Sequence, residues 1–114
     1  MNLVFNELSD GIRVIGLGGS LDLAGTASVE TRFYAHCNAE VPRIVVDLSA
    51  TTFVGSLGIR MLLQAIKSAK ARGGRLIMIH PAAAVASTLE LAGLGSFLLK
   101  GGADEAVALL AAGK

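Results

Sequence analysis

The sequence predicts an α/β domain: a single-layer mixed β-sheet of about four or five strands carrying about four helices, with an N-terminal hairpin followed by a parallel β-α-β unit. Two observations lead to this class. Apolar residues make up 53% of the 114 residues and are mostly Ala, Val, Ile and Leu, with aromatic residues at only 4%. Short aliphatic runs also alternate along the chain with segments of helical periodicity. Ala-rich helices packed on a Val/Ile/Leu sheet give this balance.

Five short segments predict the strands: residues 3–8, 12–17, 43–48, 75–80 and 96–100. The first two form a hairpin, because Ser-Asp-Gly lies between them and Gly11 is free to take a positive φ. The third and fourth are continuous aliphatic runs, typical of strands covered on both faces. With a helix between them they form a β-α-β unit, so we expect a right-handed crossover and parallel pairing. The fifth predicts a short edge strand.

Four segments predict the helices: residues 24–39, the region from 56 to the Gly73-Gly74 stop, residues 82–92, and the region from 104 onward. The first places Val29, Phe33 and Cys37 on one face, so Cys37 belongs to the core. The second has one buried stripe, made of Ile59, Leu62, Leu63, Ile66 and Ala69. Gly93 stops the third helix, and Asp104 and Glu105 favour the positive N-terminal end of the last.

Composition and charge exclude several classes of protein. Ten Lys and Arg against nine Asp and Glu give a net charge of +1, too balanced for a chain that coats nucleic acid. No apolar stretch reaches the roughly 18–20 residues of a membrane helix, and no signal peptide is visible. We therefore expect one domain over residues 1–114, without membrane insertion. The single cysteine cannot form an internal disulfide, which agrees with a cytoplasmic location.

Catalytic and metal-binding patterns are not found. His36 and Cys37 are adjacent, so on a helix they point about 100° apart, and His80 stands alone at a strand end. No nucleophile elbow of the G-x-S-x-G kind occurs. The glycines of residues 16–19 lack the G-x-G-x-x-G spacing, and no Walker motif is present. We expect no enzyme, no metal and no cofactor, and any ATP to be bound by another chain.

The most informative segment is residues 47–60, DLSATTFVGSLGIR. A buried strand ends here, residues 49–55 predict a loop, and a helix begins at Ser56. Such carboxyl-edge loops are where open α/β sheets place their sites. The Ser56 hydroxyl is expected to cap free backbone N–H groups. A phosphate on Ser56 would lie at the positive end of the helix, and Gly55 and Gly58 add little bulk around it.

The run from residue 45 to residue 81, with DLS at 47–49, Phe53, GSLG at 55–58 and RGGRL at 72–76, resembles a STAS domain. It is similar in particular to the stand-alone anti-sigma factor antagonists of bacteria. GSLD at 19–22 is similar to the Gly-x-Leu-Asp segment of that family, and LELAGL at 89–94 to its closing helix and turn. Many members have Asp-Ser-Ser-Gly where this chain has Gly-Ser-Leu-Gly.

The resemblance implies a regulatory protein-binding switch. The unphosphorylated antagonist binds an anti-sigma factor that is a serine kinase of the GHKL ATPase type. Phosphorylation of the serine before the helix, here Ser56, ends the binding, and a serine phosphatase restores it. The expected partner-binding residues are Asp22, Gly55, Ser56, Leu57, Gly58, Arg60 and Gln64.

Several alternatives stay open. Asp22 either contacts the partner or caps the first helix, a role that Thr26 also fits. The polar side of the second helix, with Arg60, Gln64, Lys67 and Ser68, is either a solvated face or a partner-binding face. The whole domain is alternatively a scaffold or accessory module without a phosphoswitch, stressosome-like or transport-associated. It is a small-ligand module only if a cavity lies under residues 49–55.

Overall fold

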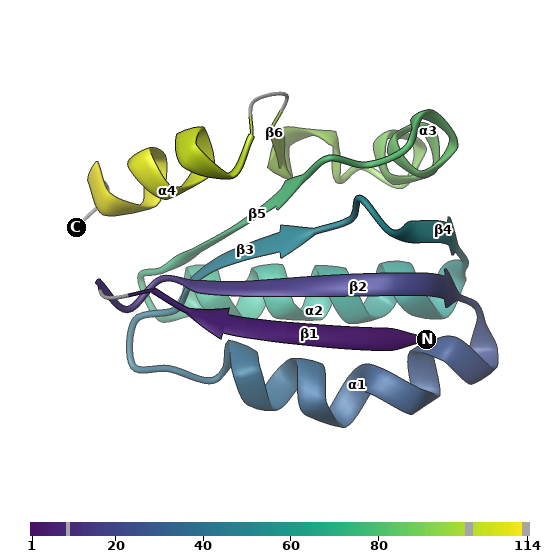
Figure 1. Cartoon of the computed structure of the whole chain (residues 1–114), viewed down its shortest axis with the longest axis horizontal. Coiled ribbons are helices and arrows are strands. Elements are labelled where there is room, and N and C mark those ends of the chain that lie inside the picture. Colours follow the sequence, from purple (N-terminus) through teal and green to yellow (C-terminus); the bar gives the residue numbers. More distant parts are fainter. Residues whose placement is uncertain (9, 100–101, 113–114) are drawn as a thin grey trace.

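The computed structural model describes residues 1–8, 10–99 and 102–112. Within this part of the chain, the helices and strands follow one another in the predicted order, with one additional short strand (Figure 1). The strands are β1 (Asn2–Glu7), β2 (Arg13–Leu21), β3 (Arg43–Asp47), β4 (Thr51–Val54), β5 (Arg75–Ile79) and β6 (Leu98–Leu99). The helices are α1 (Leu23–Cys37), α2 (Ser56–Ala71), α3 (Ala83–Leu91) and α4 (Ala103–Ala112), with a 3₁₀ turn, η1 (Gly95–Phe97), before β6.

The strands form one mixed sheet with the order β1-β2-β3-β5-β6, and β4 pairs with β2 beside this path. β1 and β2 are antiparallel, joined by a turn in which Gly11 has φ +83°, as predicted. β2–β3, β3–β5, β5–β6 and β2–β4 are parallel. The predicted fold class is therefore confirmed, with a hairpin first and a parallel β3-α2-β5 crossover after it.

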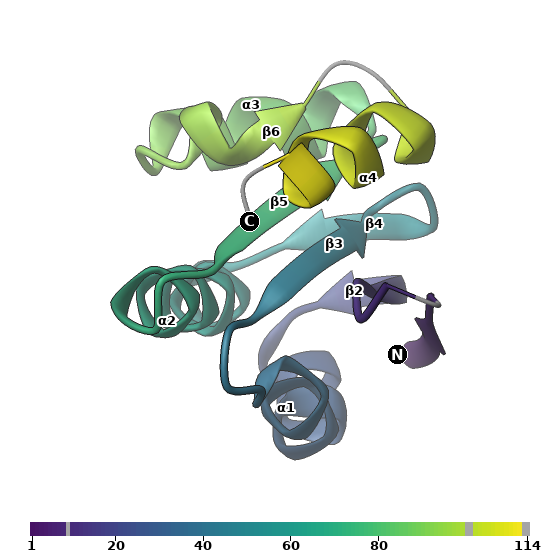
Figure 2. The same ribbon diagram turned by 90° about the vertical axis from the view of Figure 1, so that its left-hand side faces the viewer.

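The helices divide the sheet into a covered face and a partly open one (Figure 2). α1 and α2 lie on one face over the larger core, to which Phe33, Met61 and Met78 belong with no exposed surface. α4 lies on the other face, where Ala106 and Leu110 join Val45 and Ile77 in a smaller cluster. Because α4 covers β3 and β5, the outer side of β1 and β2 is left open. None of the helices in the described ranges is long and apolar enough to span a bilayer.

Two local predictions were wrong in detail. Residues 49–55 were expected to form a loop, but they contain β4. Its burial sequence is buried, exposed, exposed, buried, which breaks the alternation that identifies a strand, and its partner β2 lies about thirty residues earlier in the chain. The edge strand expected over 96–100 is the two-residue β6 preceded by η1, and Lys100 lies outside the described residues. With β4 the sheet has six strands.

β2 is long enough to pair with two different strands on one side. Its first half, Arg13–Gly16, pairs with β3, and its second half, Gly19–Leu21, pairs with β4, with a register shift between Gly19 and Ser20. The buried Thr51 holds this junction, because its Oγ1 donates a 2.6 Å hydrogen bond to the Leu17 carbonyl. The hydroxyl therefore satisfies a main-chain acceptor where β2 passes from one partner to the other.

Thr51→Val is expected to lower the free energy of unfolding by about 1–2 kcal/mol, because it keeps the shape but leaves a buried carbonyl without its donor. Thr52, the next residue, is exposed, so Thr52→Val is the matched control and should change stability by less than about 0.5 kcal/mol. Urea denaturation of the two variants measures the difference. Equal stabilities would show that the Thr51 bond does not hold β4 in place.

Candidate functional site

The candidate site lies where β2 and β4 end together at the carboxyl edge of the sheet. Leu21 and Val54 are register partners in this parallel pair, and the Gly55 amide donates to the Leu21 carbonyl at 3.0 Å. The residues that follow, Asp22 and Gly55, therefore leave the sheet side by side, and each is the N-cap of a helix. Two helix N-termini, with their unpaired N–H groups and positive dipole ends, thus meet at one edge.

Asp22 caps α1. Its Oδ1 accepts a 2.7 Å hydrogen bond from the Gly25 amide, while the residue as a whole remains exposed. The expectation that Asp22 caps the first helix is confirmed, and Thr26 is instead buried one turn into the helix. Capping does not remove the carboxylate from the surface, so Asp22 is also accessible to a partner.

Ser56 is the first residue of α2 and is exposed. The expectation that its hydroxyl caps the helix is wrong: Gly55 occupies the N-cap position, and no side chain caps α2. A residue one position inside the helix cannot fold its short side chain back onto the next amides in the way an N-cap residue does. The first turn of α2 also contains no acidic residue. The start of α2 therefore has no side-chain cap, and no acidic residue in its first turn balances the positive end of the helix dipole.

The two glycines that flank Ser56 have different environments. Gly55 is half-buried, and a Cβ there would meet the Phe53 ring at 3.2 Å. Gly58 is buried, and a Cβ there would lie 2.8 Å from the Leu21 Cβ and 3.1 Å from its carbonyl oxygen. Gly58 thus faces the sheet rather than the surface. Its contribution is to let the first turn of α2 approach the end of β2 closely.

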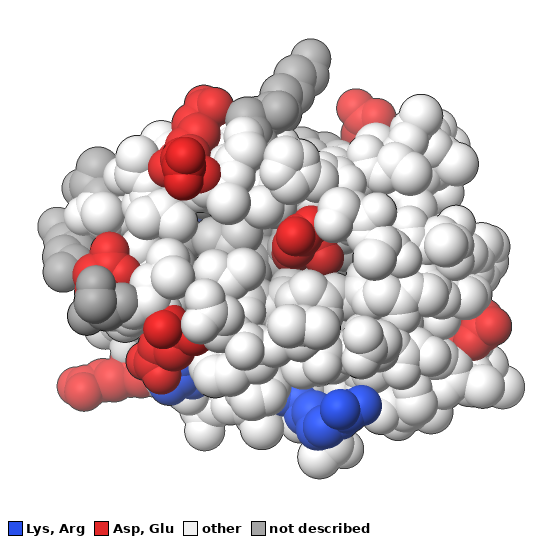
Figure 3. All heavy atoms as spheres, viewed as in Figure 1, with Lys and Arg blue, Asp and Glu red and all other residues white. Residues whose placement is uncertain are grey.

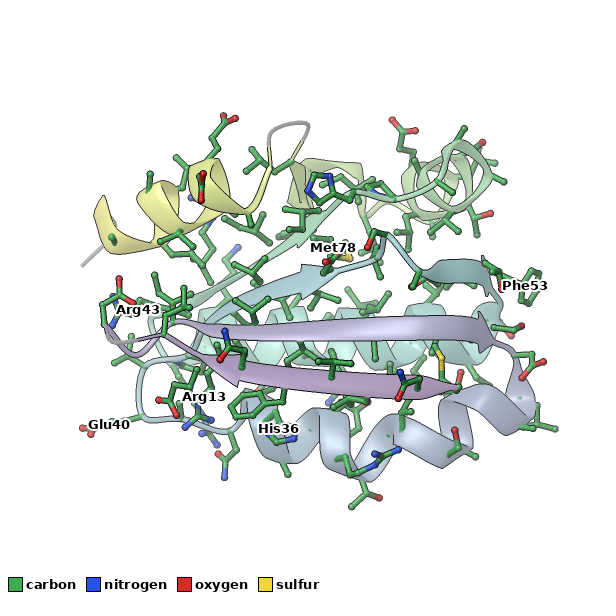
Figure 4. The ribbon with its side chains drawn as sticks, viewed as in Figure 1. Arg13, His36, Glu40, Arg43, Phe53 and Met78 are labelled. Atoms are coloured by element: carbon green, nitrogen blue, oxygen red, sulfur yellow. The ribbon has the colours of Figure 1, made fainter. Side chains whose placement is uncertain are left out.

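Two exposed apolar side chains belong to the segments that meet at this edge, and no sequence pattern predicts their exposure. Phe53 in β4 is 52% exposed, and Leu23, the first residue of α1, is 72% exposed. Phe53 points outward beyond the end of the sheet (Figure 4). Leu57, the residue after Ser56, is half-buried. Exposed large apolar side chains grouped around a polar centre are typical of surfaces that bind other proteins.

The charge around the site is uneven although the whole chain is nearly neutral. Residues 48–89 contain no Asp or Glu, and the basic residues of α2 are exposed: Arg60, Lys67 and Lys70, together with Gln64 and Ser68. Acidic side chains are instead spread over the face drawn in Figure 3, where few basic ones reach the surface. α2 lies behind the sheet in that view. The exposed side of α2 is therefore a polar, predominantly basic surface that starts at Ser56.

The cysteine and His36 are packed against other side chains. Cys37 is buried in the larger core, and burial raises the pKa of its thiol to about 12, with Arg13 acting in the opposite direction. The His36 ring stacks on Phe5 with ring centroids 3.9 Å apart. Within the described residues no group of three or more His, Cys, Asp or Glu side chains is placed to hold a metal ion.

A hollow of about 300 Å³ is lined by Asp47, Ser49 and Ala50 together with the open side of β1 and β2.

Fold and site together define a small α/β domain that presents an exposed serine at a helix N-terminus beside apolar side chains. The family model of the STAS domain matches residues 6–108 of the chain. The chain therefore belongs to the STAS domain family.

Several solved structures have the same fold. SpoIIAA, an anti-sigma factor antagonist, matches in its unphosphorylated form with a TM-score of 0.81 and 19% identity over 97% of each chain. The phosphorylated form of SpoIIAA, a Bacillus cell fate determinant, matches with a TM-score of 0.73 and 19% identity over 95% of this chain and 98% of that one. An anti-sigma factor antagonist from Mycobacterium paratuberculosis has a TM-score of 0.82 and 24% identity over 96% and 93%.

The murine anion transporter Slc26a9 matches with a TM-score of 0.74 and 16% identity over 90% of this chain but only 18% of its own. At these identities the structural matches establish the fold alone. A search of curated protein sequences finds no match.

Gly58→Ala is expected to lower the free energy of unfolding by about 1–2 kcal/mol. The added methyl clashes with Leu21, at a typical cost of about 1–3 kcal/mol for overpacking, and the better helix propensity of Ala recovers up to about 1 kcal/mol. Ser68→Ala, at an exposed position of the same helix, is the control and should be neutral or slightly stabilising. Thermal or urea denaturation checks both. A stabilised Gly58→Ala variant would mean that α2 does not pack this closely on β2.

Proposed function

We propose that this protein is an anti-sigma factor antagonist. It binds a serine-kinase anti-sigma factor of the GHKL ATPase type, and phosphorylation of Ser56 ends that binding. The observation that supports the proposal most directly is the exposed Ser56 at the uncapped start of α2, with exposed Phe53 and Leu23 beside it. SpoIIAA, which has the same fold, is known in an unphosphorylated and a phosphorylated form.

The proposed partner surface extends from the sheet edge along the first turns of α2. Its accessible members are Asp22, Gly55, Ser56, Leu57, Arg60 and Gln64, with Gly58 supporting them from below. Phe53 and Leu23 add apolar area that the partner removes from water. The side chains around Ser56 are therefore suited to a close-packed protein interface, in which the serine hydroxyl lies at the centre.

The chain supplies only the acceptor in the phosphoryl transfer. The Ser56 oxygen forms a bond to the γ-phosphorus of ATP, the bond to the ADP oxygen breaks, and the serine proton passes to a base of the kinase. The partner holds ATP and Mg²⁺. A serine phosphatase hydrolyses the phosphoserine and returns the hydroxyl, and both reactions belong in the cytoplasm. The protein itself is not an enzyme in this scheme.

A phosphate on Ser56 is compatible with the fold of this chain. It adds a charge of about −1.5 to −2 at the positive end of α2, where the first turn has no acid. Arg60 is exposed and lies four residues further along the helix, at the spacing that brings side chains together. The loss of binding therefore arises at the interface. When the partner binds, the phosphate loses its water and is repelled by any like charge on the partner's surface.

Incubation with the candidate kinase and ATP is expected to place one phosphate on Ser56, located by mass spectrometry. Ser56→Ala should bind the anti-sigma factor about as well as the wild type, whereas Ser56→Asp should bind at least tenfold more weakly, a change of about 1.4 kcal/mol. Ser87→Ala, exposed on α3, is the control and should behave as the wild type in both assays. Stoichiometric phosphate on another residue, or wild-type binding by Ser56→Asp, would refute the proposed switch.

Ser56→Asp is also expected to raise the free energy of unfolding by about 0.5 kcal/mol at low salt, because the new carboxylate compensates the helix dipole. Ser68→Asp, at an exposed position in the second half of α2, carries the same change of charge away from the N-terminus and should bring no gain. Urea denaturation at about 20 mM and about 1 M NaCl, two ionic strengths about 50-fold apart, measures the gain and its screening by salt. A clear loss of stability in Ser56→Asp would place the disruptive effect of the phosphate within this chain.

A further inference from the structure

A second candidate site lies at the opposite end of the sheet from Ser56. A hollow of about 450 Å³ lies at the amino ends of β3 and β5, between the Gly73-Gly74 turn and α4. Arg43 and Arg75 line it together with Val41, Leu109 and Leu110. Figure 4 shows Arg43 at one end of the sheet and Phe53 at the other. Helix α2 joins the two ends, and its 16 residues span about 24 Å.

The two arginines are direct neighbours. Arg43 and Arg75 are register partners in the parallel pair β3–β5, so their side chains leave the sheet on the same face. Like charges opposite each other on adjacent strands destabilise a sheet. Among the described residues the one ion pair is Arg13–Glu7, and neither Arg43 nor Arg75 takes part in it. The pair therefore brings two positive charges together, and no carboxylate in the described part of the chain forms an ion pair with either.

Arg43 is also incompletely hydrogen-bonded. Its Nη2 donates to the Asp10 carbonyl, which fixes the side chain, but its Nη1 is buried and has no hydrogen-bond partner among the residues that the structure describes. A buried donor that has lost water without gaining an acceptor is costly, and more so when the group is charged. Arg75, by contrast, is exposed. An anion in the hollow would offset the repulsion between both groups and bring acceptors close to Arg43.

The other wall of the hollow is apolar. Leu110 is buried beneath it, while Val41 is 53% exposed and Leu109 37% exposed. These three side chains come from the segment before β3 and from α4, so the hollow combines a cationic side on the sheet with an apolar side around it. This division selects ligands that carry a negative charge at one end and hydrocarbon at the other.

We propose that this hollow binds a medium-chain aliphatic carboxylate. The carboxylate lies against Arg43 and Arg75, whose planar guanidinium groups match its geometry, and the hydrocarbon lies against Val41, Leu109 and Leu110. The volume of about 450 Å³ equals roughly fifteen times the 30 Å³ of a liquid water molecule, which accommodates a ligand of about ten non-hydrogen atoms. The site is separate from Ser56 and does not depend on the proposed phosphorylation.

Octanoate is the probe, and isothermal titration with ¹H–¹⁵N NMR on the full chain provides the measurement. We expect a Kd below about 1 mM and shifts confined to the amides around Val41, Gly74 and Leu109. Arg75→Gln should weaken binding at least tenfold, and Leu109→Glu should abolish it by placing a negative charge in the apolar wall. Arg32→Gln, an exposed arginine on α1, is the matched control and should bind as the wild type does.

Three comparisons decide between the chemical alternatives. Acetate and inorganic phosphate, which lack hydrocarbon, and octanol, which lacks charge, should each bind at least tenfold more weakly than octanoate. Binding of acetate or phosphate as tight as octanoate, or equal binding of octanol, would overturn the amphiphilic assignment. Absence of octanoate binding at 5 mM, or binding unchanged in both Arg75→Gln and Leu109→Glu, would overturn the site itself. Ser56→Asp should bind octanoate normally, which keeps this test independent of the proposed switch.

Discussion

The structure depends above all on the way β2 is shared between two parallel partners. Its first half pairs with β3 and its second half with β4, and the Thr51 hydroxyl satisfies the Leu17 carbonyl at the junction. Because β2 and β4 end in register, their following helices begin side by side. Asp22 and Ser56 lie 34 residues apart in the sequence, and this strand pair is what brings them to one edge. Gly58 then allows α2 to pack against the end of β2.

Much of the fold could be predicted from the sequence because it is encoded locally. The aliphatic runs of β3 and β5, the stripe of α2 and the Gly11 turn each carry their signal within a few residues, and their observed bounds lie close to the predicted ones. β4 could not be predicted in the same way. It is four residues long, it lacks alternation, and it is stabilised by a partner far away in the chain. A strand of this kind is specified by tertiary pairing rather than by its own pattern.

In the candidate site too, the features with a local sequence signal could be predicted, and those that depend on tertiary packing could not. Ser56, Gly55 and Asp22 were identified from their motifs, since each precedes or opens a helix. The role of the Ser56 hydroxyl was not predicted correctly. Ser56 would be the N-cap if the helix began at residue 57, but the helix begins at residue 56, and helix bounds are not fixed that closely by sequence. The exposure of Phe53 and Leu23 depends on the packing of neighbouring elements. The pairing of Arg43 with Arg75 depends on the register of β3 and β5, which no periodicity reveals.

In the proposed switch, a negative charge at one surface position would weaken binding without weakening the fold. A negative charge at Ser56 would lie at an uncapped helix N-terminus, four residues before Arg60 and on a helix without acidic residues, so α2 itself does not oppose it. In this proposal the phosphate would disturb a partner packed on Phe53 and Leu23, where water is excluded and a charge without a matching cation is costly. Binding and folding would then respond with opposite sign to the same group. A switch of this kind preserves the folded domain in both states, because the phosphate is desolvated, and becomes unfavourable, only when the interface forms.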